Sequence, residues 1–202
     1  MNIPKLDDVI KHSKIHPSRI FNVYMFGSRV YGTFDQNSDY DIIMVANNSV
    51  ESTEIRNGLF NIHVYTPNKF QADFDWFRIN NLECVFDPDW AKLKETIHYD
   101  FKMNQPKLRH AISHVSSNSW VKAKKKIELN VYYIGVKSLF HSIRIPMFGI
   151  QIGTYGKITD FGCANFIWDD IKSKKWNWQD LSDKYHPLLN QTMTEFRKIV
   201  RK

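Results

Sequence analysis

The chain has 202 residues, of which 43% are hydrophobic, and this length and composition indicate a globular protein of one or two domains rather than a disordered chain. No run approaches the ~18 consecutive apolar residues that cross a bilayer, and the first residues lack the apolar stretch of a secretory signal, so we expect neither a membrane span nor export. With Cys84 and Cys163 as the only cysteines, we expect free thiols in a reducing cytoplasm.

The net charge of +7 is distributed unevenly along the chain. Residues 1–100 carry 10 Lys and Arg against 14 Asp and Glu, whereas residues 101–202 carry 18 against 7. An acidic half followed by a basic half suits an enzyme whose substrates are polyanions, such as nucleotides and RNA or DNA. The alternative is a basic surface that only keeps the protein soluble.

The first elements predicted in chain order are a short helix and a buried strand. Apolar residues at helical spacing predict the helix over residues 4–14. Residues 19–26, RIFNVYMF, are almost continuously apolar, which predicts a strand buried on both faces. Gly27 and Ser28 then end this strand in a tight turn that leads into barely two helical turns.

Two carboxylates open the next predicted strand, residues 39–46. Asp39 and Asp41 are two residues apart, and side chains at that spacing in a strand point the same way. Because Mg²⁺ is typically held by one or two carboxylates together with substrate phosphates, the pair predicts a Mg²⁺ or Mn²⁺ site. Gly27 lets the backbone approach a phosphate closely, and amides at a helix start favour anions. The alternative is a surface hairpin whose acidic residues are simply solvated.

The order Gly27-Ser28, ten residues, then Asp39-Tyr40-Asp41, between apolar strands, resembles the signature of the DNA polymerase β-like nucleotidyltransferase superfamily. The resemblance implies transfer of a nucleoside monophosphate from an NTP to a hydroxyl, with release of pyrophosphate. It also implies that Asp39 and Asp41 hold the metal, and that Gly27 and Ser28 bind the β and γ phosphates.

Two residues near this turn are further candidates for nucleotide binding. Ser38 directly precedes the first aspartate, and similar proteins commonly have Ser-Asp there. Arg29 follows Ser28 and either reaches a phosphate or caps against Asp35; the sequence does not decide between them.

A third strand is predicted over residues 59–65, with Asn61, His63 and Tyr65 on one face. The resembling proteins usually carry a third carboxylate on this strand, and this sequence has none there. His63 can replace it as the base that takes the proton from the attacking hydroxyl, or it only packs on the sheet. If Asn61 stands in the place of the acid instead, water or the substrate must supply the base.

The sequence predicts several helices after this strand. Thr66-Pro67 predicts a helix start, and residues 80–86 and 88–98 predict two more helices. In the second half, residues 119–145 can run as one helix and residues 148–160 are interpreted as a connector. Residues 161–171 and 187–200 predict the last two helices.

Within the long predicted helix, Lys137, His141 and Arg144 recur at positions i, i+4 and i+7 and form one stripe of donors, opposite a set of apolar residues. Such a stripe suits a triphosphate, and the spacing resembles the helical domain of the nucleotidyltransferases. Ordinary amphipathicity is the alternative. Nearby, Trp176 and Trp178 follow a run rich in lysine and either stack bases or close a helical core.

The pattern predicts an α+β fold: a small mixed-sheet nucleotidyltransferase domain over residues 1–104 and a basic, all-α helical domain over residues 105–202. The predicted partners are an NTP and a nucleic acid, with an RNA or tRNA end as acceptor. Two other function classes stay open. One is a catalytically silent module that binds nucleotide or RNA, and the other is a toxin–antitoxin type nucleotidyltransferase that modifies tRNA or a protein.

Overall fold

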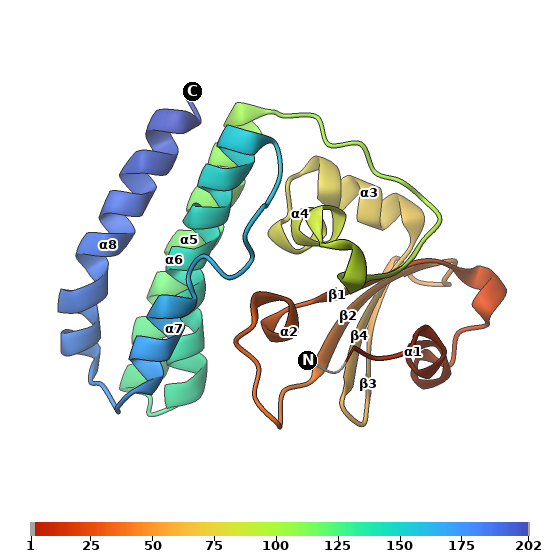
Figure 1. The fold of residues 1–202 in the computed structure, drawn as a ribbon, viewed down its shortest axis with the longest axis horizontal. Helices are drawn as coiled ribbons and strands as arrows, with labels where there is room; N and C mark the ends of the chain where they lie inside the picture. Colours follow the sequence, from red (N-terminus) through yellow and green to blue (C-terminus); the bar gives the residue numbers. More distant parts are fainter. Residues whose placement is uncertain (1–2, 202) are drawn as a thin grey trace. The chain divides into compact units, whose positions relative to one another are not determined.

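The computed structural model describes residues 3–201, and the chain forms two compact units that divide between Phe101 and Lys102 (Figure 1). The first unit contains, in chain order, α1 (Leu6–Ser13), a 3-10 turn (Pro17–Arg19), β1 (Ile20–Phe26), α2 (Ser28–Tyr31), β2 (Tyr40–Ala46), β3 (Ser52–Asn57), β4 (Phe60–Tyr65), α3 (Pro67–Asp75), α4 (Ile79–Phe86), a second 3-10 turn (Asp89–Ala91) and β5 (Lys92–Glu95). The second unit contains α5 (Gln105–Glu128), α6 (Tyr132–Tyr155), α7 (Asn165–Lys172) and α8 (Trp178–Ile199).

The five strands form one mixed sheet in the order β3-β4-β2-β1-β5. Strands β2 and β4 are parallel, and the other neighbouring pairs are antiparallel. A mixed sheet followed by helices confirms the predicted α+β class. The three predicted strands are β1, β2 and β4, whose central positions in the sheet explain their apolar sequences, because both faces of a central strand are covered.

The sequence did not reveal the two edge strands. Strand β3 reads STEIRN and is mostly exposed, so it has little of the apolar signal on which strand prediction depends. Strand β5 lies where a helix over residues 88–98 was predicted, and that prediction is wrong. The buried side chain of Asn22 on β1 explains the outcome: its Oδ1 accepts the backbone N–H groups of Thr96 and Ile97, both at 2.9 Å, and holds the end of β5 in place.

Helices cover the two faces of the sheet. On one face, Phe70 of α3 stacks on Tyr24 of β1 with ring centroids 6.0 Å apart. On the other face, His12 of α1 lies against Phe60 of β4 at 4.5 Å. The start of α3 agrees with its prediction, since the side chain of Thr66 accepts a hydrogen bond from the backbone N–H of Lys69.

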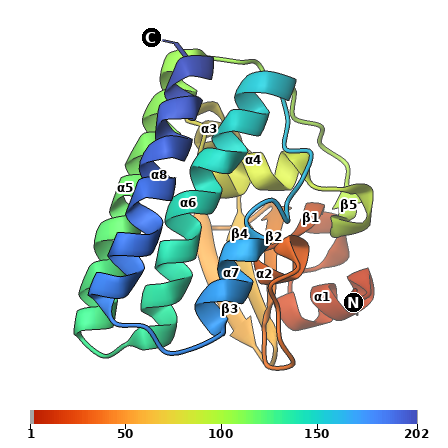
Figure 2. The ribbon, with the colours of Figure 1, turned by 60° about the vertical axis from the view of Figure 1, so that its left-hand side comes forward.

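The second unit is a helical bundle, and the bounds of its helices differ from the predicted ones (Figure 2). The break between α5 and α6 lies at residues 129–131, so residues 119–145 are not one helix. Helix α6 continues to Tyr155, and the predicted connector over residues 148–160 is wrong over most of its length. Helix α8 begins at Trp178 and includes Pro187, whereas the sequence pattern predicts a start at Pro187.

Close packing of α6 against α8 explains why glycines that resembled a loop lie in a helix. A Cβ atom added at Gly149 would lie 2.8 Å from the ring of Phe196, and one added at Gly153 would lie 2.8 Å from Val200. Both glycines therefore allow the backbone of α6 to approach the end of α8. Their role is in helix packing, which a reading of local turn propensity does not detect.

Both cysteines are free thiols, as expected. Cys84 is fully buried in α4, and burial together with the neighbouring Asp87 raises its pKa well above the ordinary value. Cys163 precedes α7, and burial raises its pKa to about 11. Within residues 3–201, no helix is long and apolar enough to cross a membrane.

Candidate nucleotide and metal site

The turn between β1 and α2 is built on a glycine that no other residue can replace without strain. Gly27 has φ +80°, in the region that favours glycine, and its carbonyl oxygen accepts the N–H groups of Val30 and Tyr31 at 3.0 and 3.1 Å. A Cβ atom at this position would lie 2.5 Å from Oδ2 of Asp41. The turn and the second carboxylate are therefore in direct contact.

Arg29 is buried, and it is used to hold the loop that leads into β2. Its Nε donates to the carbonyl oxygen of Asp39 at 3.1 Å and its Nη2 to that of Ser38 at 2.5 Å. The guanidinium lies 3.9 Å from the ring centroid of Tyr40. Of the two predicted roles, contact with Asp35 is not seen. The carbonyl contacts fix the backbone beside the first aspartate.

Ser38 has a structural role in the same loop. Its Oγ accepts the backbone N–H of Asp35 at 2.8 Å and donates to Oδ1 of that aspartate at 3.2 Å. This pair of bonds closes the loop tightly just before Asp39. The side chain of Asp39 is exposed, whereas that of Asp41 is half-buried.

Strand β4 places Asn61 directly beside Asp41. The two residues are partners in the parallel register of β2 and β4, and Nδ2 of Asn61 donates to Oδ1 of Asp41 at 3.1 Å. The same Nδ2 lies 3.4 Å from Nε2 of His63, whose ring makes an edge contact with Phe26 at 5.8 Å. Asn61 is therefore the residue of β4 beside Asp41, and His63 lies two residues further along the strand.

The orientation of the Asn61 amide turns its oxygen away from Asp41. Its NH₂ group faces the carboxylate of Asp41, as electrostatics requires, so Oδ1 points elsewhere. Among the described residues, this buried oxygen has no hydrogen-bond partner. In this orientation the amide offers Asp41 a hydrogen-bond donor rather than an oxygen for a shared cation.

The protein donors fit a metal that also takes ligands from its substrate. Over residues 3–201, no group of three or more His, Cys, Asp or Glu side chains could hold a metal ion. Asp39 and Asp41 instead offer two carboxylates. This donor set matches Mg²⁺, which usually keeps positions for phosphate oxygens and water.

A buried acidic group supports the turn between β1 and α2. Glu83 of α4 is fully buried and accepts a hydrogen bond from the hydroxyl of Tyr31 at the end of α2. One helical turn further on, Asp87 is also buried, and burial and the charge of Glu83 raise its pKa well above the ordinary value. No local signal could reveal the Tyr31–Glu83 contact, because the two residues are far apart in sequence.

The donor stripe of the helical unit lies on α6, where most side chains are buried. Arg144 is buried, with its guanidinium 4.8 Å from the ring centroid of Phe148, and Lys137 is half-buried, with its Nζ 5.8 Å from that of Tyr133. Burial, and then the charges of Arg144 and Lys137, hold the pKa of His141 well below its ordinary value. Burial therefore disfavours the charged form of the central imidazole of the stripe.

A model of the nucleotidyltransferase domain matches residues 9–127, which is more than half of the chain. The protein belongs to this nucleotidyltransferase domain family. The match spans the Gly27 turn, both aspartates and the whole sheet, and it ends within α5. It confirms the family that the spacing of the motif indicated. A comparison with curated proteins gives no match.

Solved structures of other nucleotidyltransferases resemble this family member at low sequence identity. A spectinomycin adenyltransferase from Enterococcus faecialis, determined with ATP and spectinomycin, is 12% identical with a TM-score of 0.46, over 96% of this chain and 100% of the other. A nucleotidyltransferase-like protein from Exiguobacterium sibiricum is 10% identical with a TM-score of 0.32, over 95% of this chain and 73% of the other.

Proposed function

We propose that the protein transfers a nucleoside monophosphate from an NTP to a hydroxyl group, with an RNA end as the acceptor. The observation that carries the proposal is the contact between the Gly27 turn and Asp41 within a domain of the nucleotidyltransferase family. This contact brings a backbone that can approach phosphates next to a carboxylate that can hold a cation.

Each candidate residue near the Gly27 turn has a specific role in this proposal. Asp39 and Asp41 would hold Mg²⁺ or Mn²⁺, which when bound neutralises charge on the triphosphate. The backbone of Gly27 and the backbone and hydroxyl of Ser28 bind the β and γ phosphates. Arg29 and Ser38 act on nucleotide binding by fixing the loop before Asp39.

The proton of the attacking hydroxyl requires an acceptor, and His63 is the candidate on β4. A neutral imidazole accepts a proton readily near pH 7. His63 follows Asn61 by two residues, and its Nε2 lies 3.4 Å from Nδ2 of Asn61, so the ring is near the carboxylate pair. The assignment of Lys137, His141 and Arg144 to the triphosphate stays a prediction.

The proposal is tested by replacing the exposed carboxylate. Asp39→Asn removes one metal ligand while keeping the size of the side chain and the backbone contacts of Arg29. Incubation with α-labelled NTPs and RNA, in Mg²⁺ or Mn²⁺ and with a chelator control, should show a loss of transfer of about 100-fold or more. Asp89→Asn, at an exposed acid of the same unit, should transfer at the wild-type rate. Wild-type transfer by Asp39→Asn would refute the metal assignment.

A second candidate function is favoured by Asn61. Because an amide replaces the carboxylate that similar enzymes usually have, the chain can also be a silent module that binds NTP without using it. Equilibrium binding of a labelled NTP together with no incorporation into tRNA, an RNA primer or cell protein would select this alternative.

A further inference from the structure

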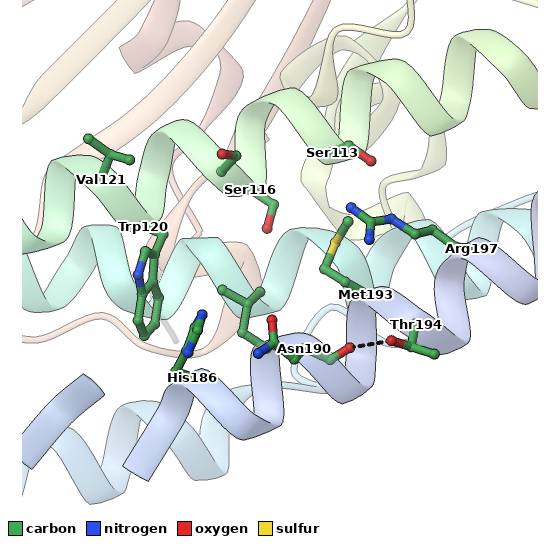
Figure 3. A pocket seen from close by; sticks show the side chains of 11 residues that line it. Ser113, Ser116, Trp120, Val121, His186, Asn190, Met193, Thr194 and Arg197 are labelled. Atoms are coloured by element: carbon green, nitrogen blue, oxygen red, sulfur yellow. Dashed lines mark hydrogen bonds between the residues drawn. The ribbon is translucent and has the colours of Figure 1, made fainter. Parts of the chain in front are cut away.

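A groove runs between α5 and α8 in the helical unit (Figure 3). It has a volume of about 330 Å³, and we call it the α5–α8 groove and define it by Ser113, Ser117, Trp120, His186, Asn190 and Arg197. A second hollow of about 660 Å³ shares Ser113, Ser117 and Arg197 with it and extends toward the start of α5, past Arg109, His110 and His114. The two hollows therefore form one continuous depression along α5.

The lining of this depression is complementary to a polyanion. It contains two arginines and three histidines, and no Asp or Glu is among its residues. Nη1 of Arg109 donates to the carbonyl oxygens of Arg197 and Val200 at 3.3 and 3.0 Å, so it anchors the end of α8. The side chain of Arg197 is exposed, and no carboxylate of the described residues forms an ion pair with it.

Aromatic rings occupy the opposite end of the groove from Arg197. The ring of His186 stacks on Trp120 at 5.3 Å with an interplanar angle of 29°. Trp178 makes an edge contact with Trp120, with ring centroids 5.1 Å apart. Of the two tryptophans that follow the lysine-rich run, Trp178 therefore packs against a ring of α5. A base can extend such a stack, because every nucleobase has an aromatic face.

Neutral hydrogen-bonding groups lie between the rings and the arginine. Ser113 comes from α5, and Asn190 and Thr194 come from α8 (Figure 3). Ser117 of α5 also lines the groove. The hydroxyl of Thr194 donates to the carbonyl oxygen of Asn190 at 2.7 Å, whereas the side-chain amide of Asn190 lies within the groove lining. Hydroxyl and amide groups are common ligands of phosphate and sugar oxygens.

From the stacked rings, the unopposed arginine and the absence of lining carboxylates, we propose that the α5–α8 groove binds single-stranded nucleic acid. One base stacks on the Trp120–His186 pair, and the phosphate backbone follows the groove toward Arg197. This inference rests on the proposed function, since it assigns the acceptor class to a surface. It adds a binding site to the transfer chemistry and requires no metal and no NTP.

The test measures binding without the reaction. Fluorescence anisotropy of a labelled single-stranded RNA of about 12 nucleotides, a length within typical single-strand sites, is recorded in EDTA without NTP. Trp120→Leu should raise Kd about tenfold through loss of stacking. Arg197→Gln should lower the slope of log Kd against log salt by about 0.7, the contribution of one phosphate contact. The matched control, Lys125→Gln, removes an exposed cation of α5 outside the groove and should leave Kd within about twofold.

Other outcomes contradict either the groove or the proposed function. Equal loss of affinity in all three variants would mean that the unit binds polyanions through its general charge. Equal affinity for an RNA duplex, or displacement of the RNA by polyglutamate, would remove the role of stacking. Failure of binding while the wild type still labels another acceptor would refute the groove and keep the transfer reaction. Binding of the RNA without any transfer would support the groove and refute the transfer reaction.

Discussion

Asn61 decides how the carboxylate pair behaves in the absence of a ligand. Its amide donates to Asp41, which partly offsets the repulsion between Asp41 and the neighbouring Asp39. A carboxylate in the place of Asn61 would instead add a third negative charge at hydrogen-bond distance. The amide therefore favours stability of the empty site over tight binding of a cation.

This balance predicts the effect of Asn61→Asp. The variant should be less stable than the wild type without metal, by about 1 kcal/mol, because like charges then lie side by side. It should also bind Mn²⁺ more tightly, so that added Mn²⁺ raises its Tm more than that of the wild type. Thermal unfolding with and without Mn²⁺ measures both effects, and Asn68→Asp, at an exposed position of α3, is the control. Identical Mn²⁺ shifts in the variant and the wild type would show that Asn61 does not adjoin the metal.

Asp87 offers a second test, on stability and pH. Its carboxylate is buried beside Glu83, and both of its oxygens lack a hydrogen-bond partner among the described residues. Burial raises its pKa, so the folded chain keeps a proton that the unfolded chain releases above the ordinary pKa of 3.8. The stability that the neutral form provides is complete below that value, and it is lost as the pH rises toward the raised pKa.

Asp87→Asn should remove this loss, because an amide does not ionise. We expect the variant to be more stable than the wild type at pH 7 by about 1 kcal/mol, with the difference shrinking as the pH falls toward 4. Urea unfolding across this pH range provides the measurement. Asp89→Asn, two residues further on and exposed, should show no such dependence. A variant whose stability followed the wild type at every pH would show that Asp87 is ionised in the folded chain.

At the scale of elements, the connection from β1 to α2 is the most constrained in the first unit. It must reverse the chain, begin a helix of four residues and leave room for Asp41. Gly27 meets all three demands, and the Tyr31–Glu83 hydrogen bond joins the other end of α2 to α4. The site is thus built from short elements that tertiary contacts hold in place.

Substitutions at two glycines with positive φ separate the cost of backbone strain from the cost of overlap with Asp41. Gly58→Ala places a side chain where nothing lies within 4 Å, so it should cost about 1 kcal/mol from backbone strain alone. Gly27→Ala adds the overlap with Asp41 and should cost at least twice as much, about 2 kcal/mol or more, and it should also abolish NTP binding. Urea unfolding and equilibrium NTP binding measure the two effects. Equal costs would mean that Asp41 moves away freely.

At the scale of the whole molecule, the chemistry divides between an acidic first half and a basic second half. The first unit carries the carboxylates proposed to hold a cation. The second unit carries a groove whose lining has arginines and histidines and no carboxylate. In our two proposals, the first unit binds a metal-bound triphosphate and the second unit binds an acceptor strand.

Sequence patterns predicted the parts of the fold that depend on local order. The apolar runs of β1, β2 and β4 and the Thr66 cap are visible in the sequence because each depends on neighbouring residues. Strand β5 and the length of α6 depend on distant partners: Asn22 holds the first, and the Gly149–Phe196 contact explains the glycines of the second. In the site, spacing indicated Asp39 and Asp41, but the support from Asn61 and Glu83 comes from strand pairing and helix docking.

The state of the two cysteines has a practical consequence for chemical labelling. A maleimide reacts with a thiolate, and both native thiols have raised pKa values that keep them protonated at neutral pH. Cys84 is also closed off from solvent. A single cysteine introduced at an exposed position such as Ser117 would therefore react far faster than either native one. The wild-type background already provides a chain in which a dye can be attached at one chosen point.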